Sequence, residues 1–599
     1  MRRSSSWMLL AFCLAAPPVR ALDEPLEAWV PDDVIGYARL SGLGEKLEQF
    51  LASNLRRELE ALEPVKQGLS NPKLQEAMGH LERFKSATGK DPVKLLQGLF
   101  GTEVLVGARL GFGGPEVLVL TRTAGEKELE EGIQTIKSAI ESHGAHPEYR
   151  ESTHGDRKIE FVQGKLAHAR LGSVWCLSNS MSIVERVVDL ADKKSASALK
   201  KSPIFAKAAD GLLKDALLSV VVRPQFLPNY HVPDKADNPL GSLLGGGWLA
   251  ALGSSDLLAA SARIADGALE VKVSSFLGEQ AKDSRLWEKY AGFFPEVVPD
   301  GLRERLEKRG VLAVTEIHRN LAQWWEKREE LLSTGAAGGL IEFANVMNIV
   351  FSPRGFQDEV LPDIGNTIAI VSRNQEYKNL SEAPKPAIPA FAAIFQLKNA
   401  EESTQSMQAA FNSIVAIINL DQANKKKEGM AMLPRIEKVG EIEMHTVAFN
   451  TSAKSKDKAK KPGLMQNFTP SMAVAGSRVI LSSSAELTKI LIEELEQLKD
   501  AKPGAGKAAD TVSVDGPAVR SILSANREVL VAQSMMEKGK SKEQAETEIG
   551  LLLDVLKHVR DLRLESGRKG DAMHLDLKLR TNLGGAAPAK KEGKKEVKL

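Results

Sequence analysis

Three histidines are the residues of this sequence whose types come closest to a metal site. His143, His146 and His154 lie in one short stretch, with Glu141 and Glu148 beside them. Imidazole and carboxylate groups both coordinate zinc. Glycine and proline interrupt the stretch, which is typical of a solvated turn, and the spacing of a helical two-histidine motif is absent. We therefore expect a polar loop here and no metal site.

Motifs for catalysis and for phosphate binding are incomplete. The nucleophile elbow Gly-x-Ser-x-Gly does not occur, and the Ser-x-x-Lys spacing of Ser197 and Lys200 is common by chance in a chain rich in both residues. Residues 504–507 lack the first glycine and the final Ser or Thr of a phosphate-binding loop. Residues 111–114 join two predicted strands, so they form a hairpin turn. The sequence predicts no catalytic residue and no cofactor, although an enzyme built from distant loops remains an alternative.

One apolar segment is a candidate for ligand binding. Residues 240–252 carry no charge and contain three consecutive glycines. One interpretation is a short helix packed closely through glycine, or a covered loop. The other is an adaptable apolar lip that contacts a lipid, a membrane surface or a protein. Under the second interpretation the ligand-binding residues are Leu243, Leu244, Trp248 and Leu249.

The N-terminal residues indicate export. Residues 1–21 begin with two arginines, continue with an apolar run over 7–16, and end with Val19-Arg20-Ala21. This pattern is typical of a cleaved secretory signal peptide, and the apolar run is too short to cross a bilayer. We expect a periplasmic or secreted protein.

Charge and cysteine content limit the classes of partner. Without Arg2, Arg3 and Arg20 the 80 basic residues become 77, against 78 acidic residues, so the formal net charge is −1. That balance does not favour nucleic acid as a partner, and no run of 18 unbroken apolar residues predicts a membrane span. Cys176 is the one cysteine after residue 21. An intramolecular disulfide is therefore impossible, and we expect a small buried side chain.

The sequence carries the same signals twice, in the same order. Residues from about 30 to 280 and from about 298 to 580 both begin with Val-Pro-Asp and both end with an alternating apolar hairpin. The sharpest match pairs residues 172–180 with residues 476–484. Each indicates a tight turn, a short buried strand, serine caps and a helix, and Ser483 with Glu486 has the spacing of a capping box. An internal repeat of this length predicts two copies of one fold.

Hydrophobic periodicity gives the fold class of each copy. The closing strands alternate apolar and polar residues, as Met573 to Arg580 do, which predicts antiparallel sheets with one covered face. The leucines at every fourth position from Leu43 to Leu59 form one helical stripe. We expect an α+β protein of two homologous domains, each an antiparallel sheet with helices packed on one face.

Four segments follow from these signals. They are a signal peptide over 1–21, a first α+β repeat over 22–285, a second α+β repeat over 286–583 and a disordered Lys-rich tail over 584–599. Residues 450–463 are also polar and rich in lysine, which is typical of a loop.

The first repeat resembles a known family at its start. Residues 30–40 read as a Pro-Asp turn and a strand that contains Val34, Tyr37 and Arg39, and a helix follows. This pattern, with the hairpin strand over 268–276, resembles the exported bacterial proteins of domain of unknown function 3352. The resemblance implies a protein of the bacterial cell envelope and supplies no catalytic residues.

The leading functional prediction is a non-catalytic binding or scaffolding protein of the cell envelope. A cleft between two repeats is a favoured place for a ligand, so the alternative is a periplasmic carrier of an apolar ligand or lipid. The expected partner is an envelope protein or an apolar ligand.

Overall fold

A computed structural model of the chain falls into two compact units. The first unit comprises residues 1–227, 257–274 and 578–599, and the second comprises 228–256 and 275–577. The predicted repeats differ in three places, because 228–256 and 275–285 belong to the second unit and 578–583 to the first. The structure describes residues 24–52, 76, 79, 82–86, 88–111, 113–142, 147–162, 164–193, 197–227, 230–233, 235–265, 267–278, 301–377, 380, 382–424, 432–449, 464–498 and 510–582.

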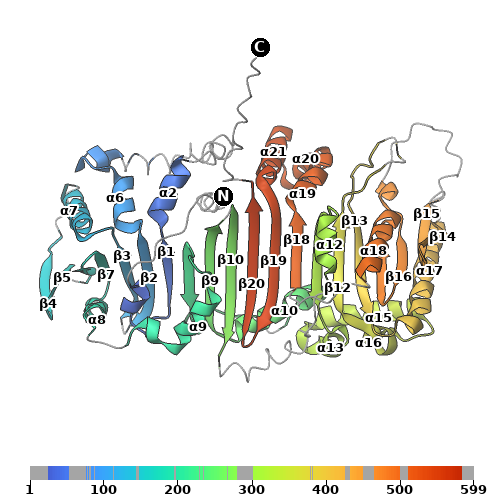
Figure 1. The fold of residues 1–599 in the computed structure, drawn as a ribbon, viewed down its shortest axis with the longest axis horizontal. Coiled ribbons are helices and arrows are strands. Elements are labelled where there is room, and N and C mark those ends of the chain that lie inside the picture. The colour runs from blue at the N-terminus through green and yellow to red at the C-terminus, as the bar shows by residue number, and fades with distance from the viewer. Residues whose placement is uncertain are drawn as a thin grey trace, which may run out of the picture. The chain divides into compact units, whose positions relative to one another are not determined.

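The first unit alternates strands and helices (Figure 1). Its helices are η1 (Leu26–Trp29), α2 (Leu43–Ala52), α6 (Pro92–Phe100), α7 (Glu126–Ser142), α8 (Met181–Ala191), η2 (Leu199–Lys201), α9 (Pro203–Gly211) and η3 (Pro224–Phe226). Its strands are β1 (Gly36–Ser41), β2 (Glu103–Gly111), β3 (Gly114–Arg122), β4 (Arg150–His154), β5 (Arg157–Val162), β6 (Leu166–Leu171), β7 (Val174–Ser178), β8 (Leu218–Val222), and most of β9 (Ser255–Ala265) and β10 (Ala268–Leu277).

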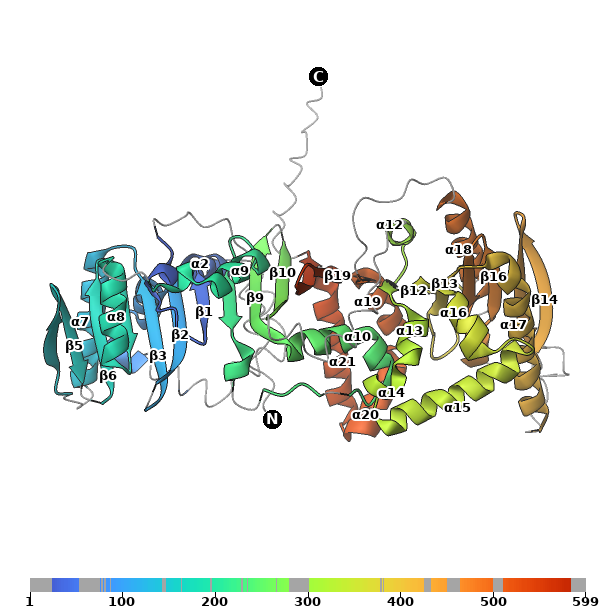
Figure 2. The same ribbon diagram turned by 90° about the horizontal axis from the view of Figure 1, so that it is seen from below.

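The second unit has the same alternation with more helices (Figures 1 and 2). Its helices are α10 (Pro239–Gly253), α12 (Leu302–Lys308), α13 (Leu321–Glu326), α14 (Arg328–Leu331), α15 (Thr334–Phe351), η5 (Phe356–Val360), α16 (Leu361–Asp363), α17 (Ala400–Asn424), η6 (Leu464–Asn467), α18 (Ala485–Leu498), α19 (Gly516–Ala525), α20 (Arg527–Lys538) and α21 (Lys542–His558). Its strands are β11 (Ala313–His318), β12 (Ile364–Arg373), β13 (Ala390–Leu397), β14 (Met432–Val439), β15 (Ile442–Phe449), β16 (Ser471–Ala475), β17 (Arg478–Ser482), β18 (Asp510–Asp515), β19 (Val559–Lys569) and most of β20 (Ala572–Thr581).

The two units have one strand order. In the first unit the hydrogen-bonded neighbours run β4-β5-β6-β7-β3-β2-β1-β8-β9-β10. In the second they run β14-β15-β16-β17-β13-β12-β11-β18-β19-β20. Each strand of the first unit thus corresponds to the strand of the second unit whose label is higher by ten, from β1 and β11 to β10 and β20. The predicted α+β class, with an antiparallel sheet in each of two like domains, is confirmed.

Helices cover both faces of each sheet, so the expectation of helices on one face describes only part of each unit. In the first unit Trp175 of β7 packs against α6 and α7, while α8 contacts β6 and β7 from the other side, where Cys176 is buried. In the second unit Ile480 packs in the cluster with α12 and α18, and its neighbour Val479 packs against α17. Adjacent residues of a strand point to opposite faces, which places these helices on opposite sides.

The serines at the repeated turn bond to the backbone of neighbouring strands and turns. They do not cap the helices that follow. Ser178 Oγ donates to the carbonyl of Val117 at 2.8 Å and accepts from the N–H of Ser180 at 3.0 Å. Helix α18 begins at Ala485, so Ser483 lies before the N-cap position and does not form the predicted capping box with Glu486. The α8 N-cap, Ser180, makes no side-chain capping bond either.

Candidate apolar binding groove

An apolar groove lies on the sheet of the second unit, over β12, β13 and β17. The strand registers align Ile370 with Ala393, and Ala393 with Leu481, so these three side chains form a row across the sheet. Phe391 points to the same face, two residues from Ala393. Ile370, Phe391 and Leu481 are 45%, 51% and 41% exposed. Such exposure is unusual for large side chains in the middle of a sheet, and it marks this face as a binding candidate.

The approach to β16 completes the groove. Phe468 and Pro470 precede β16 and line the space together with the row on the sheet. The groove has a volume of about 550 Å³ and is open to solvent. This volume falls within the range of small-molecule sites, about 300–1,000 Å³.

The polar side chains that line the groove are the serines of the repeated turn, and both make hydrogen bonds. Ser483 Oγ accepts from the N–H of Phe391 at 3.0 Å. Ser482 Oγ donates to the carbonyls of Phe391 and Ser484, at 3.2 and 3.0 Å. The other lining residues are Ile370, Phe391, Ala392, Ala393, Phe468, Pro470 and Leu481. The lining carries no ionisable group, so the groove is suited to hydrocarbon and offers no acid, base or nucleophile pair.

A second cavity on this unit has a different character. It is lined by both charged and apolar residues, including Glu316, Gln396 and Arg478, but its volume is about 10 Å³. That is close to the space of one water molecule, so the cavity cannot hold a substrate.

The first unit repeats the row of the groove. Val106 is aligned with Val119, and Val119 with Leu177. Asn179 Oδ1 accepts from the N–H of Val117 at 2.8 Å, as Ser483 does from Phe391. Val106 and Val117 are 41% and 39% exposed. The row and its hydrogen bonds therefore belong to the repeated fold, while the wall of Phe468 and Pro470 belongs to the second unit.

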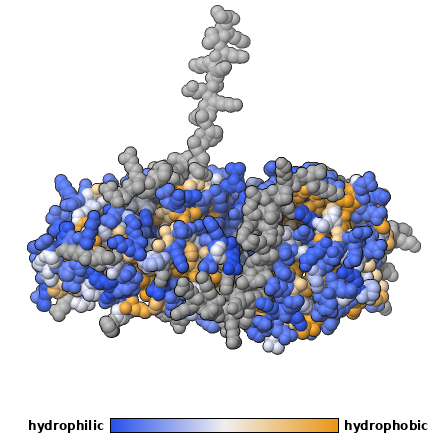
Figure 3. All heavy atoms as spheres, turned by 60° about the horizontal axis from the view of Figure 1, so that its bottom comes forward, coloured by the Kyte–Doolittle hydropathy of each residue, from blue (hydrophilic) through white to orange (hydrophobic). Residues whose placement is uncertain are grey.

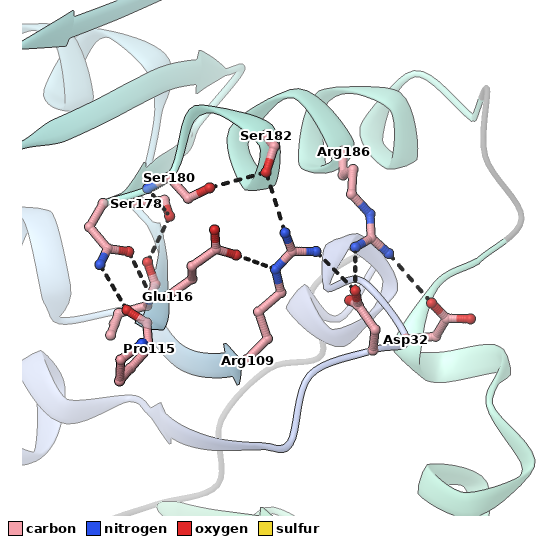
Figure 4. Close-up of polar contacts among 11 residues, drawn as sticks. Asp32, Arg109, Pro115, Glu116, Ser178, Ser180, Ser182 and Arg186 are labelled. Carbon is pink, nitrogen blue, oxygen red and sulfur yellow. Dashed lines mark hydrogen bonds and ion pairs between the residues drawn. The ribbon is translucent and has the colours of Figure 1, made fainter. Parts of the chain in front are cut away.

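The Val-Pro-Asp turn of the first unit enters a network of ion pairs (Figure 4). Asp33 Oδ2 lies 2.9 Å from Arg109 Nη1 and 2.6 Å from Arg186 Nη1. Arg109 also pairs with Glu116 and donates to Ser182 Oγ at 3.3 Å. Partial burial alone would raise the pKa of Asp33, but the hydrogen bonds and positive charges of Arg186 and Arg109 outweigh it and hold that pKa below its ordinary value. The network joins the turn to β2, β3 and α8. Its counterpart at residues 298–300 lies outside the described residues.

The candidate residues of the apolar segment lie on α10. Asn238 caps this helix by accepting from the N–H groups of Leu240 and Gly241. Leu243 and Trp248 are half-buried and pack against a cluster that includes Trp324 and Trp325. Leu244 is 41% exposed, and Leu249 is half-buried. The helix interpretation is confirmed, and none of the four residues lines the groove. Trp324 and Trp325 of α13 are buried.

One arginine that sequence reasoning missed fixes α10. Arg319 is 2% exposed and donates to the carbonyls of Leu243 and Leu244 at 2.7 and 3.1 Å. Its Nη2 lies 2.6 Å from Asp510 Oδ2. Trp248 lies on the same helix, and its Nε1 donates to Ser566 Oγ of β19 at 2.6 Å. These bonds anchor α10 in the second unit.

The histidine stretch and the cysteine carry no reactive site in the described residues. His143 and His146 lie outside those residues, and His154 Nε2 is 2.9 Å from Asp189 Oδ1. Within the described part of the chain no group of three or more His, Cys, Asp and Glu side chains could hold a metal ion. Cys176 is buried, as predicted, and burial raises the pKa of its thiol.

Two helices of the second unit carry large apolar side chains in contact with solvent, and Figure 3 shows hydrophobic patches among a mostly hydrophilic surface. On α15 these are Ile341, Phe343, Val346 and Ile349, and on α17 Ile414, Ile417 and Leu420. Among the described residues, α15 is the one helix long and apolar enough to cross a membrane by length and composition, with 17% of it buried. Residues 334–351 are not an unbroken apolar run, because Glu342, Asn345 and Asn348 interrupt them. The sequence therefore did not predict a membrane span there.

Comparisons with known proteins do not assign this chain to a family. No protein-family model matches the chain, and no curated protein matches it. Two similar solved structures carry the titles "Structure of crystal form I of TP0453" and "Structure of crystal form III of TP0453". The first shares 10% identity, covers 44% of this chain and 81% of that chain, and has a TM-score of 0.23. The second shares 10% identity over 43% of this chain and 82% of that chain, with a TM-score of 0.21. A likeness this low carries no argument about fold or function.

Proposed function

We propose that this is an exported binding protein of the bacterial cell envelope that holds a hydrocarbon chain in the groove of its second unit. The observation that carries the proposal is the lining of the groove. Seven apolar residues and two hydrogen-bonded serines line an open groove of about 550 Å³. Burying hydrocarbon against them gains about 25 cal/mol for each Å² removed from water.

The export part of the proposal is supported by residues 1–21 and by the resemblance to domain of unknown function 3352. A binding role without catalysis is supported by the groove lining, which has no ionisable group. The groove lies within one unit, so this site does not depend on a cleft between the repeats.

Binding of a fluorescent long-chain fatty acid to the mature protein tests the proposal. The variant Ala393→Trp places a large ring in the centre of the row on the sheet, and we expect it to weaken binding at least about tenfold. The control Ala206→Trp makes the same change at an exposed position of α9 in the first unit, and it should bind like the wild type. Native mass spectrometry of protein purified from its source should show a bound lipid. Equal binding by Ala393→Trp and the wild type would refute the groove as the site.

A further inference from the structure

We propose that two copies of this chain associate through β14, strand against strand, across a two-fold axis. The proposal goes beyond the groove, which lies over β12, β13 and β17 and does not include β14. Within the described part of the chain, β14 pairs with β15 and with no other strand. One edge of β14 is therefore unpaired, and such an edge is a template for a further strand.

The turn after β14 determines which backbone groups lie on that edge. Residues 440–441 form a two-residue turn, and Val439 is aligned with Ile442 across it. The residues that flank such a turn are hydrogen-bonded to each other. Along an antiparallel strand, hydrogen-bonded and non-hydrogen-bonded positions alternate. The odd-numbered residues of β14 thus direct their backbone groups to β15, and the even-numbered residues direct theirs away from it.

One even-numbered residue confirms this alternation. The N–H and the carbonyl of Met432 both bond to the side chain of Asn419 on α17, at 2.7 and 2.9 Å, and so do not point to β15. The backbone groups available to a further strand are those of Pro434, Ile436 and Lys438. Since Pro434 has no N–H, it offers a carbonyl only.

The charges on β14 favour one register for self-pairing. Arg435 and Glu437 are two residues apart, so they lie on the same side of the strand. In an antiparallel pair centred on Ile436, Arg435 of each copy lies opposite Glu437 of the other copy. Centring the pair on Arg435 or on Glu437 would place two like charges opposite each other, which is destabilising.

The remaining pairs of this register are also compatible. Ile436 is 63% exposed and lies opposite Ile436 of the other copy, while Leu433, 44% exposed, lies opposite Val439. The two central isoleucines exchange two backbone hydrogen bonds. At each end the N–H of Lys438 donates to the carbonyl of Pro434, which needs no N–H from the proline. Strand pairing and side-chain pairing therefore agree.

This agreement selects a second copy of the chain as the occupant. A two-fold contact brings one surface against itself, so the surface must be complementary to itself, and residues 433–439 meet that condition. Arg435 is exposed and makes no ion pair within the described residues. Glu437 lies 2.7 Å from Lys489 and is 41% exposed. A carboxylate accepts several hydrogen bonds, so Glu437 can also accept from Arg435 of the other copy.

Sedimentation equilibrium of the full mature chain tests the proposal. Because one strand pair makes a small interface, the wild type should pass from monomer to dimer over a concentration series reaching about 200 µM. Arg435→Glu and Glu437→Arg, each alone, should weaken dimerisation by about tenfold or more, since like charges then lie opposite each other. The control Lys438→Glu changes a charge that lies opposite Pro434, and it should dimerise like the wild type.

A mixture of the two charge variants gives the sharpest result. In a mixed pair of Arg435→Glu with Glu437→Arg, unlike charges again lie opposite each other at both positions. The mixture should therefore dimerise about as well as the wild type, although neither variant does so alone. Misfolding of either variant cannot produce this recovery.

A backbone variant tests the strand pairing itself. Ile436→Pro removes an N–H that points away from β15, as Pro434 already does, so β14 should still pair with β15 and the circular dichroism spectrum should not change. Its dimerisation should fall about tenfold or more. A monomeric wild type, or dimerisation unaffected by Ile436→Pro or by the charge variants, would overturn the proposal. So would a mixture that stays monomeric. Ile436→Pro should still bind the fluorescent fatty acid, so failure of the dimer and failure of the groove give different results.

Discussion

Ser483 Oγ accepts a hydrogen bond from the N–H of Phe391 at 3.0 Å, and this bond fixes the start of β13, the strand that carries this side chain into the groove. The first unit has the same arrangement, with Asn179 Oδ1 and the N–H of Val117 at 2.8 Å. A side chain that follows one strand thus bonds to the backbone of the neighbouring strand in both units. The groove depends on this contact, because Phe391 can face the ligand only while its backbone stays paired.

Removing the Ser483 hydroxyl should loosen the groove. We expect Ser483→Ala to lower the free energy of unfolding by about 1 kcal/mol, because the N–H of Phe391 loses its acceptor. Fatty acid affinity should fall with it. Urea denaturation measures the first effect, and Ser477→Ala, at an exposed position of the preceding turn, is the control. Unchanged stability would show that water replaces the hydroxyl without cost.

The buried ion pair between Arg319 and Asp510 should be the most sensitive polar contact of the second unit. Arg319→Met removes the positive charge that pairs with Asp510, which keeps the N–H of His318, and it leaves two carbonyls of α10 without this donor. We expect a loss of about 3–5 kcal/mol in the free energy of unfolding. The exposed pair of Lys385 and Glu528 is the control, and Lys385→Met should produce no measurable change. Equal effects of the two variants would contradict the anchoring role of Arg319.

Two leucines of α10 distinguish a packed helix from a ligand-binding lip. Leu243 packs against the cluster with Trp324 and Trp325, so Leu243→Ala should cost about 2 kcal/mol. Leu244 is exposed, so Leu244→Ala should change stability by less than about 0.5 kcal/mol. We expect fatty acid binding to remain intact in Leu244→Ala. Loss of binding in that variant would restore α10 as the site.

The ion pairs of Asp33 should make the first unit less stable in acid. Because Arg186 and Arg109 hold the pKa of Asp33 below its ordinary value, the folded state favours the carboxylate. The resulting stabilisation is complete above the ordinary pKa, about 3.9, and it disappears as the pH falls through the lower folded pKa. The stability difference between the wild type and Asp33→Asn should therefore shrink over that range. It should also shrink at high salt, because these groups are partly exposed. A difference that stays constant with pH would exclude this cause.

Much of the fold follows from the sequence because its signals are local. Alternating apolar residues predict the closing hairpins, and the match of residues 172–180 to 476–484 predicts two like domains, which have a common strand order. The hairpin turn at 111–114 also agrees, since β2 ends at Gly111 and β3 begins at Gly114. These features depend on neighbours in the chain, so the sequence displays them directly.

The groove could not be predicted because its residues come together only through strand pairing. Ile370, Phe391 and Leu481 are far apart in the sequence, and the registers alone align them. One signal was available: β12, β13 and β17 are apolar at both odd and even positions, as in Phe391-Ala392-Ala393-Ile394. Strands of this kind need cover on both faces, so the part of a face that α17 leaves uncovered indicates a binding surface. Arg319 gave no local signal, since its partners at 243, 244 and 510 are all distant.

Residues 228–256 belong to the second unit and residues 578–599 to the first. This assignment determines the order in which the two units can be completed during synthesis. The first unit includes Thr581, whose N–H bonds to the carbonyl of Gly267 at 3.0 Å, and Lys578, which lies 2.6 Å from Glu270. These contacts form only after residues 578–581 have been synthesised. The second unit consists of residues 228–256 and 275–577, so all of its residues have been synthesised before Lys578. A protein arranged in this way completes its first unit after its second, so a growing chain leaves the edge beside Gly267 and Glu270 unpaired until residues 578–581 have been synthesised.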